Sequence, residues 1–254
     1  MHPDHELNRA SWDRLAALHG QDAYYDTEAL VAGASSLIEE EEAALAAAVG
    51  GDLAGVRVLH VQCHLGLDAI TFARRGARVT GVDFSAVALE RAAALARRCA
   101  VDVEWVRADV TDLPATLHGR FDLAWATMGI LCWIADAGAW MRSVARTLAP
   151  GGRLVLMDGQ PRAQAAEGSR MVYVDGRDYA SDARAGLQVQ FRHALPEIVS
   201  AAAGAGLRIL GVKEQAAVSW HLCIEGVVLE PDGRYRRRED GQAQPVLFTL
   251  VAEK

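Results

Sequence analysis

The chain has 254 residues, of which 51% are hydrophobic and 23% charged, and its formal net charge is −7. This composition excludes a disordered chain, and the acidic balance argues against a nucleic-acid partner because phosphates select a basic surface. No stretch approaches the roughly 18 uninterrupted apolar residues of a membrane span, and the N-terminus lacks the basic-then-apolar order of a signal peptide. We therefore expect a cytoplasmic protein with no membrane partner.

The predicted elements begin with two helices in residues 5–48, the second rich in alanine and with the glutamates at 39–42 as a solvated face. From residue 56, short β-branched runs alternate with helical stretches. We expect strands at 56–61, 77–83, 103–109, 121–126 and 153–158, and helices at 67–75, 86–99 and 137–148. Crossovers of this length require a parallel sheet with helices on both faces.

The alternation changes after Asp158. Residues 159–190 are polar and predicted to be irregular, a helix follows at 195–205, and a sixth strand follows at 207–212. Residues 219–241 are rich in turn residues, and a seventh strand is expected at 246–252. No helix fits between the last two strands, so they should form an antiparallel pair at one edge. The predicted fold is a Rossmann-like α/β sheet of seven mostly parallel strands with an antiparallel last strand and an N-terminal helical lid.

Neither the cysteines nor the basic residues indicate a metal or phosphate site. The four cysteines are scattered without a CxxC pair, which is typical of reduced, mostly buried thiols: Cys63, Cys99, Cys132 and Cys223. His60, Cys63 and His64 lie close in sequence, but no second ligand pair follows, so no metal is expected. The arginines at 234 and 236–238 are interpreted as a solvated loop, with an anion site as the alternative.

Three residues stand where a parallel α/β sheet binds its ligand, at the carboxyl ends of its strands. Gly66 opens a helix directly after the first strand, where backbone can approach a ligand and the helix N-terminus favours an anion. Asp83 ends the second strand, where an acid can accept both ribose hydroxyls of an adenosine. Asp109 ends the third strand, where it could accept a hydrogen bond from an adenine amino group. Both acids have helix or turn capping as an alternative role.

In these motifs the chain resembles class I S-adenosylmethionine-dependent methyltransferases, and among them a bacterial subgroup with a QCHxGLD loop. The resemblance rests on 58–68 (VLHVQCHLGLD), 73–85 (ARRGARVTGVDFS), 108–110 (ADV), 121–122 (FD), 129–133 (GILCW) and 148–152 (LAPGG). Residues 8–12 (NRASW) and 19–25 (HGQDAYY) resemble the subgroup's leader, and 193–198 (HALPEI) and 247–250 (LFTL) its tail. The resemblance implies one domain over 1–254: a lid at 1–50, a cofactor-binding core at 56–158, a substrate insertion at 159–193, and a C-terminal helix and strands at 194–254.

The chain departs from the wider family in two places. Gln62 and His64 replace the first two glycines of the GxGxG loop, and Gln62 is expected near the methionine portion of the cofactor. The subgroup commonly has His-Pro after the fifth strand, where this chain has Gln160-Pro161 at the substrate end.

The resemblance implies S-adenosyl-L-methionine as the cofactor. The expected cofactor-binding residues are Trp12, Tyr24, Gln62, His64, Gly66, Asp83, Phe84, Asp109, Val110 and Thr127. His193 is the candidate base, because imidazole titrates nearest neutrality, with packing at a helix start as its alternative role, and Tyr25 in the lid is the second catalytic candidate. The tryptophans at 125, 133 and 140 are expected in the core.

The predicted activity is methyl transfer to oxygen or nitrogen of a small-molecule acceptor, in bacterial secondary metabolism, by a monomer or homodimer. Aminopropyl transfer or cyclisation and a non-catalytic S-adenosylmethionine-binding protein remain as alternatives. An NAD-dependent dehydrogenase is disfavoured, since it would need GxGxxG after the first strand.

Overall fold

The computed structural model describes residues 2–20, 25–160, 170–177, 184–221 and 226–254. The helices are α1 (Pro3–Leu18), α2 (Thr27–Val31), α3 (Glu39–Val49), α4 (Leu67–Arg74), α5 (Ala86–Arg98), α6 (Ala137–Thr147) and α7 (Leu195–Gly204), with 3-10 turns at Ala115–Leu117 and Leu131–Trp133. The strands are β1 (Arg57–Val61), β2 (Arg78–Asp83), β3 (Glu104–Arg107), β4 (Phe121–Ala126), β5 (Leu148–Gly159), β6 (Arg170–Arg177), β7 (Arg184–Phe191), β8 (Arg208–Gln215), β9 (Val227–Leu229), β10 (Tyr235–Glu239), β11 (Gln242–Gln244) and β12 (Leu247–Glu253). Within the described residues, no helix is both long and apolar enough to cross a membrane.

Seven strands form the central sheet in the order β3-β2-β1-β4-β5-β12-β8. The first five pair in parallel, and β12 runs antiparallel to both β5 and β8. The predicted seven-stranded sheet with an antiparallel last strand is therefore confirmed. Strand order reverses between β1 and β4, which is where a doubly wound sheet opens a ligand crevice.

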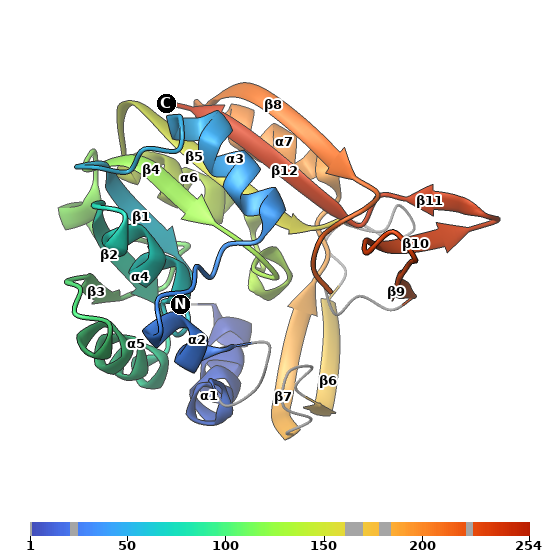
Figure 1. The fold of residues 1–254 in the computed structure, drawn as a ribbon, viewed down its shortest axis with the longest axis horizontal. Coiled ribbons are helices and arrows are strands. Elements are labelled where there is room, and N and C mark those ends of the chain that lie inside the picture. Colours follow the sequence, from blue (N-terminus) through green and yellow to red (C-terminus); the bar gives the residue numbers. More distant parts are fainter. Residues whose placement is uncertain (1, 21–24, 161–169, 178–183, 222–225) are drawn as a thin grey trace.

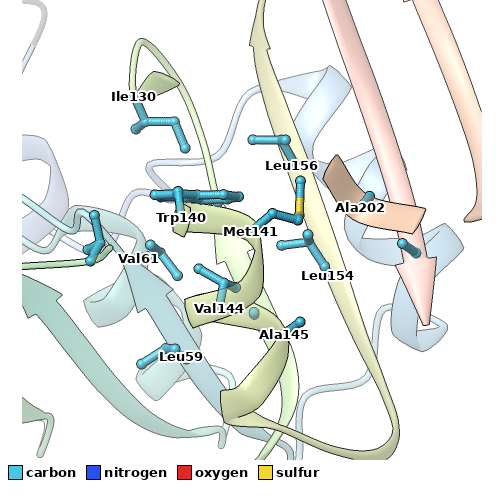
Figure 2. Packing of buried hydrophobic residues seen from close by; sticks show 14 of the residues in the cluster. Leu59, Val61, Ile130, Trp140, Met141, Val144, Ala145, Leu154, Leu156 and Ala202 are labelled. Atoms are coloured by element: carbon cyan, nitrogen blue, oxygen red, sulfur yellow. The ribbon is translucent and has the colours of Figure 1, made fainter. Parts of the chain in front are cut away.

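Helices cover both faces of the sheet, with α3 and α4 in front of it and α6 and α7 behind it (Figure 1). The side chains of each strand alternate between the two layers, so Leu59 and Val61 of β1 pack towards α6 while Val58 packs towards α3 and α4. Figure 2 shows the fully buried Trp140 ring of α6 with Val61 and Ile130 close by. The predicted burial of the three tryptophans is confirmed, since Trp125 and Trp140 are fully buried and Trp133 is 8% exposed.

The peripheral segments differ from the sequence-based expectation. The described part of residues 5–48 contains three helices, because Asp26 caps a short α2 and the chain then turns at Gly33 before α3. Residues 159–190 were expected to be irregular, yet β6 and β7 form an antiparallel hairpin that projects from the sheet (Figure 1). Asn8 of α1 holds this hairpin through two 2.8 Å hydrogen bonds with the backbone of Val189.

The turn-rich C-terminal segment also contains strands, since β9, β10 and β11 form a separate antiparallel sheet. Asp240 and Gly241 both have positive φ angles, 48° and 77°, between the paired residues Glu239 and Gln242. A two-residue Asp-Gly turn of this kind is a strong hairpin signal. The nearby arginines pair with carboxylates, as in Arg234 with Glu39 and Glu40, which favours the solvated-loop interpretation over an anion site.

Candidate active site

A cavity of about 550 Å³ opens at the carboxyl ends of β1, β2, β3 and β4. Its walls come from α1, from the segment between Tyr25 and Glu41, from the four strand ends and from Ser219 and Trp220. The predicted site residues that line it are Trp12, Tyr25, Gln62, His64, Asp83, Phe84, Asp109, Val110 and Thr127. Gly66 and His193 are not among the lining residues, and Tyr24 lies outside the described residues.

The loop after β1 is held in an unusual backbone conformation without glycine. Gln62 and His64 have φ angles of 54° and 48°, the left-handed region that costs an ordinary residue about 1–2 kcal/mol. The Gln62 side chain donates to the Ile130 carbonyl (3.2 Å) and accepts from Trp140 Nε1 (2.9 Å), so it fastens this loop to the one after β4. The His64 N–H donates to Asp83 Oδ2 (2.9 Å). Side-chain and backbone hydrogen bonds thus fix this turn although neither residue is a glycine.

Gly66 has a packing role that the sequence did not reveal. It is the N-cap of α4 with φ 71°, and a Cβ there would lie 2.4 Å from Trp105 Cη2. Gly81 of β2 faces the same indole, since its Cβ would lie 2.4 Å from Trp105 Cζ3. Both glycines therefore make room for Trp105, and neither lines the cavity.

Asp83 ends β2 as a buried carboxylate in the cavity wall. Its Oδ2 accepts the His64 N–H and its Oδ1 accepts the Ser85 N–H, both at 2.9 Å. Burial raises its pKa to about 6 although these hydrogen bonds favour the charged form. Each oxygen keeps a lone pair for a further donor, so this group suits two adjacent hydroxyls. Phe84 follows it in the wall.

Asp109 follows β3 and is tied to the N-terminal helix. Ala135 N–H donates to His5 Nε2 (3.1 Å), so the neutral ring carries its proton on Nδ1 and donates it to Asp109 Oδ2 (3.3 Å). Burial opposes ionisation, but hydrogen bonds from His5 and Thr111 outweigh it and lower the pKa of Asp109 to about 2. Asp109 is therefore an anion at the cavity wall, beside the buried Val110.

Aromatic rings close the cavity on the side of α1. Trp12 meets His64 and Trp133 edge-on at centroid distances of 5.2 and 5.3 Å. Tyr25 stacks on His19 at 4.5 Å, and His19 Nδ1 lies 2.8 Å from His64 Nε2. These contacts connect the N-terminal segment to the loop after β1, which is what the lid hypothesis requires.

His193 is turned away from the cavity. Its Nε2 donates to the Ile134 carbonyl (2.6 Å), and its Nδ1 lies 3.0 Å from Glu197 Oε1. Both ring nitrogens are thus engaged by protein groups, and the ring is 4% exposed. This geometry supports the alternative role, in which the imidazole fixes the start of α7 against the chain after β4.

The sequence reasoning missed a buried polar cluster under α3. The glutamates at 39–42 were expected on a solvated face, but Glu41 is 4% exposed and lines the cavity beside His60 and Asp68. Glu41 is buried because α3 packs across the sheet, so that one position of its first turn must face inward (Figure 1). In the described part of the chain, no group of three or more His, Cys, Asp or Glu side chains could hold a metal ion.

Comparison with known proteins agrees with this geometry. Residues 58–152 match the model of a family described as a methyltransferase domain. Its span runs from β1 into β5 and includes Gln62, Asp83 and Asp109, which is most of the predicted 56–158 core.

Relatives and solved structures extend the match. A ubiquinone biosynthesis O-methyltransferase of Xanthomonas oryzae pv. oryzae (strain PXO99A) is 40% identical to this chain over 105 residues. The aligned region is 41% of this chain and 44% of the relative, so the chain spans less than half the length of the curated relatives it matches. An S-adenosylmethionine-dependent methyltransferase from Mesorhizobium loti aligns at a TM-score of 0.58 and 22% identity, over 88% of this chain and all of that one. The 1,6-didemethyltoxoflavin-N1-methyltransferase of Burkholderia thailandensis, solved with S-adenosylhomocysteine, aligns at 0.56 and 20% identity, over all of this chain and 91% of that one. The fold, the predicted enzyme class and the predicted cofactor all agree with these matches.

Proposed function

We propose that this protein transfers a methyl group from S-adenosyl-L-methionine to a small-molecule acceptor. The observation that carries the proposal is the Asp83 carboxylate, which ends β2 inside a methyltransferase domain and faces the cavity with one lone pair free on each oxygen. Two adjacent ribose hydroxyls are the natural donors for such a group. Asp109, which follows the neighbouring strand β3, would accept a hydrogen bond from the adenine amino group.

The residues fit this cofactor without a glycine-rich loop. When bound, S-adenosylmethionine supplies an electrophilic methyl group on a sulfonium. The chain contributes alignment, since Gln62 and Asp83 fix the loop after β1, and it excludes water with the rings of Trp12 and Trp133. With no free ring nitrogen on His193, Tyr25 is the remaining catalytic candidate from the sequence, and it lines the cavity.

The kind of methyl acceptor and its metabolic context are also part of the proposal. The relatives named for ubiquinone biosynthesis align only with the cofactor-binding core, so their substrate is not transferred to this chain. We place the protein in bacterial secondary metabolism because its alanine-, arginine- and glycine-rich composition is typical of high-GC bacteria, and we expect a monomer or homodimer.

The test uses donor labelled in two ways. With S-adenosylmethionine labelled in its methyl carbon, label should move to the acceptor and S-adenosylhomocysteine should form. Label that moves only from the aminopropyl carbon would instead identify the alternative transfer or cyclisation. Calorimetric titration with S-adenosylhomocysteine and with NAD provides the binding control. Binding of NAD alone would overturn the proposal, and binding of S-adenosylhomocysteine without transfer to any acceptor would leave a non-catalytic binding protein.

A further inference from the structure

The cavity has a second polar region besides the strand-end acids. Glu41 enters it from α3, His60 from β1 and Asp68 from the first turn of α4. His60 and Val58 share the strand face that packs under α3 and α4, whereas Asp83 ends β2 and Asp109 follows β3. This region, the Glu41–His60–Asp68 cluster, is thus built from elements other than those that carry the strand-end acids.

The cluster presents acceptors and negative charge. Asp68 Oδ1 accepts from the Ser36 hydroxyl (2.7 Å), and its Oδ2 accepts from Trp125 Nε1 (3.0 Å) and the Thr127 hydroxyl (3.3 Å). These neutral donors hold a carboxylate in place without neutralising it. The described residues that line the cavity include six acids and no lysine or arginine: Asp26, Glu39, Glu41, Asp68, Asp83 and Asp109.

His60 shows that the cluster lacks a donor. The side chain is 4% exposed, and its buried Nδ1 has no hydrogen-bond partner. Its Nε2 lies 4.0 Å from Asp68 Oδ2, so a neutral ring with its proton on Nε2 leaves Nδ1 as a bare acceptor. Burial lowers the pKa of His60, while burial and the Asp68 carboxylate raise that of Glu41 to about 8. A bound cation that carries N–H groups would donate to the unpaired Nδ1 of His60 and would oppose the raised pKa of Glu41.

The walls around the cluster suit the body of an organic amine. Leu37, Met128 and Trp220 line the cavity together with the cluster. The chain before Trp220 is fastened to α3, since both the N–H and the hydroxyl of Ser219 hydrogen-bond to Glu40 (2.8 and 2.5 Å). A tryptophan and two carboxylates are typical partners of an ammonium group.

We propose that the Glu41–His60–Asp68 cluster binds an ammonium group of the methyl acceptor as a recognition element, so that the acceptor is a compound that carries a cationic amine. This inference rests on the proposed methyl-transfer function. An ammonium group could also come from the methionine part of the cofactor, and the experiment separates these two sources.

The probes are benzylammonium and benzyl alcohol, which differ in shape only at the terminal group. Their binding is measured by ligand-observed NMR on protein saturated with S-adenosylhomocysteine. Wild type should bind benzylammonium at least about tenfold more tightly than the alcohol, and Glu41→Gln and Asp68→Asn should each remove that preference. Glu42→Gln is the matched control, because this neighbour makes the same charge change on the outer face of α3, where Glu42 pairs with Arg75. Circular dichroism verifies that each variant is folded. If Asp68→Asn does not fold, Glu41→Gln still tests the proposal.

The source of the ammonium is decided by titrating each variant with S-adenosylhomocysteine and with 5′-methylthioadenosine, which lacks the amino acid. Unchanged affinity for both compounds, with loss of benzylammonium binding, supports the acceptor site. Loss of affinity for S-adenosylhomocysteine alone would assign the cluster to the cofactor and overturn the proposal. Equal binding of the two benzyl probes by wild type would overturn it as well. Failure of wild type to bind S-adenosylhomocysteine would instead refute the proposed function.

Discussion

Asp83 makes the affinity for the cofactor depend on pH. Its pKa is raised to about 6 by burial, from an ordinary value of 3.8. Ribose hydroxyls prefer the ionised carboxylate, so cofactor binding must draw Asp83 into its charged form, and affinity should fall as the pH drops through 6. About nine-tenths of Asp83 is ionised at pH 7 and about one-tenth at pH 5, which predicts a decrease in affinity of about tenfold between these values.

Substitution of Asp83 tests whether this carboxylate is the titrating group. Asp109, with a pKa of about 2, stays ionised between pH 5 and 7 and does not contribute to the pH dependence of cofactor affinity. Asp83→Asn removes the titrating group and should lose most of the pH dependence. It should also weaken binding at pH 7, by about 1.5–3 kcal/mol for each hydrogen bond that loses its charged acceptor.

The assay is calorimetric titration with S-adenosylhomocysteine at pH 5, 6 and 7 on wild type, Asp83→Asn and Asp122→Asn. Asp122 is the matched control because it makes the same charge change at the start of β4, where it pairs with Arg57. A wild-type affinity that is flat over the interval would refute the reasoning. The same slope in Asp83→Asn would also refute it, because another group would then be titrating.

Three further predictions concern the supports of the site. Gly66→Ala should lower the free energy of unfolding by about 2–4 kcal/mol, through positive-φ strain and the clash with Trp105, and Gly81→Ala by about 1–3 kcal/mol through the clash alone. Urea denaturation measures both. In a Trp105→Leu background the cost at position 66 should fall to the positive-φ strain and the contact with Ala92 Cβ (3.2 Å), and the cost at position 81 to the contact with Cys63 Sγ (3.1 Å). Undiminished costs in that background would contradict the packing explanation. His193→Gln should lower the melting temperature, because the ring nitrogens contact Ile134 and Glu197, but it should keep turnover per folded molecule within about twofold of wild type. A stable variant that binds the cofactor with full affinity but shows no turnover would instead support His193 as the catalytic base. Asn8→Ala should cost about 1–3 kcal/mol by leaving the Val189 backbone groups unpaired, and an unchanged thermal transition would show that this clamp is dispensable.

Some features of the fold were predictable because they follow from local chemistry. The alternation of β-branched runs with alanine-rich helices indicated β1 to β5, and Ser85 caps α5 through its hydroxyl as expected. The missed strands had local signals too, since Asp240-Gly241 is a hairpin turn by composition. The β6–β7 hairpin was harder to predict, because β7 is fastened from outside by Asn8 of a helix far away in sequence.

The sequence by itself determined the order of β1 to β5 and of the helices between them. It also indicated that Asp83 and Asp109 lie at the ligand edge, because the ends of parallel strands meet at one edge whatever the detailed packing. Only the tertiary structure decided which way individual side chains face. It showed Gly66 making room for Trp105, His193 bonded at both nitrogens, and Glu41 buried in a run of four glutamates. These outcomes depend on contacts between segments that are far apart in the sequence, such as Gly66 with Trp105 and His193 with Ile134. A periodic pattern along one segment carries no information about its neighbours in space.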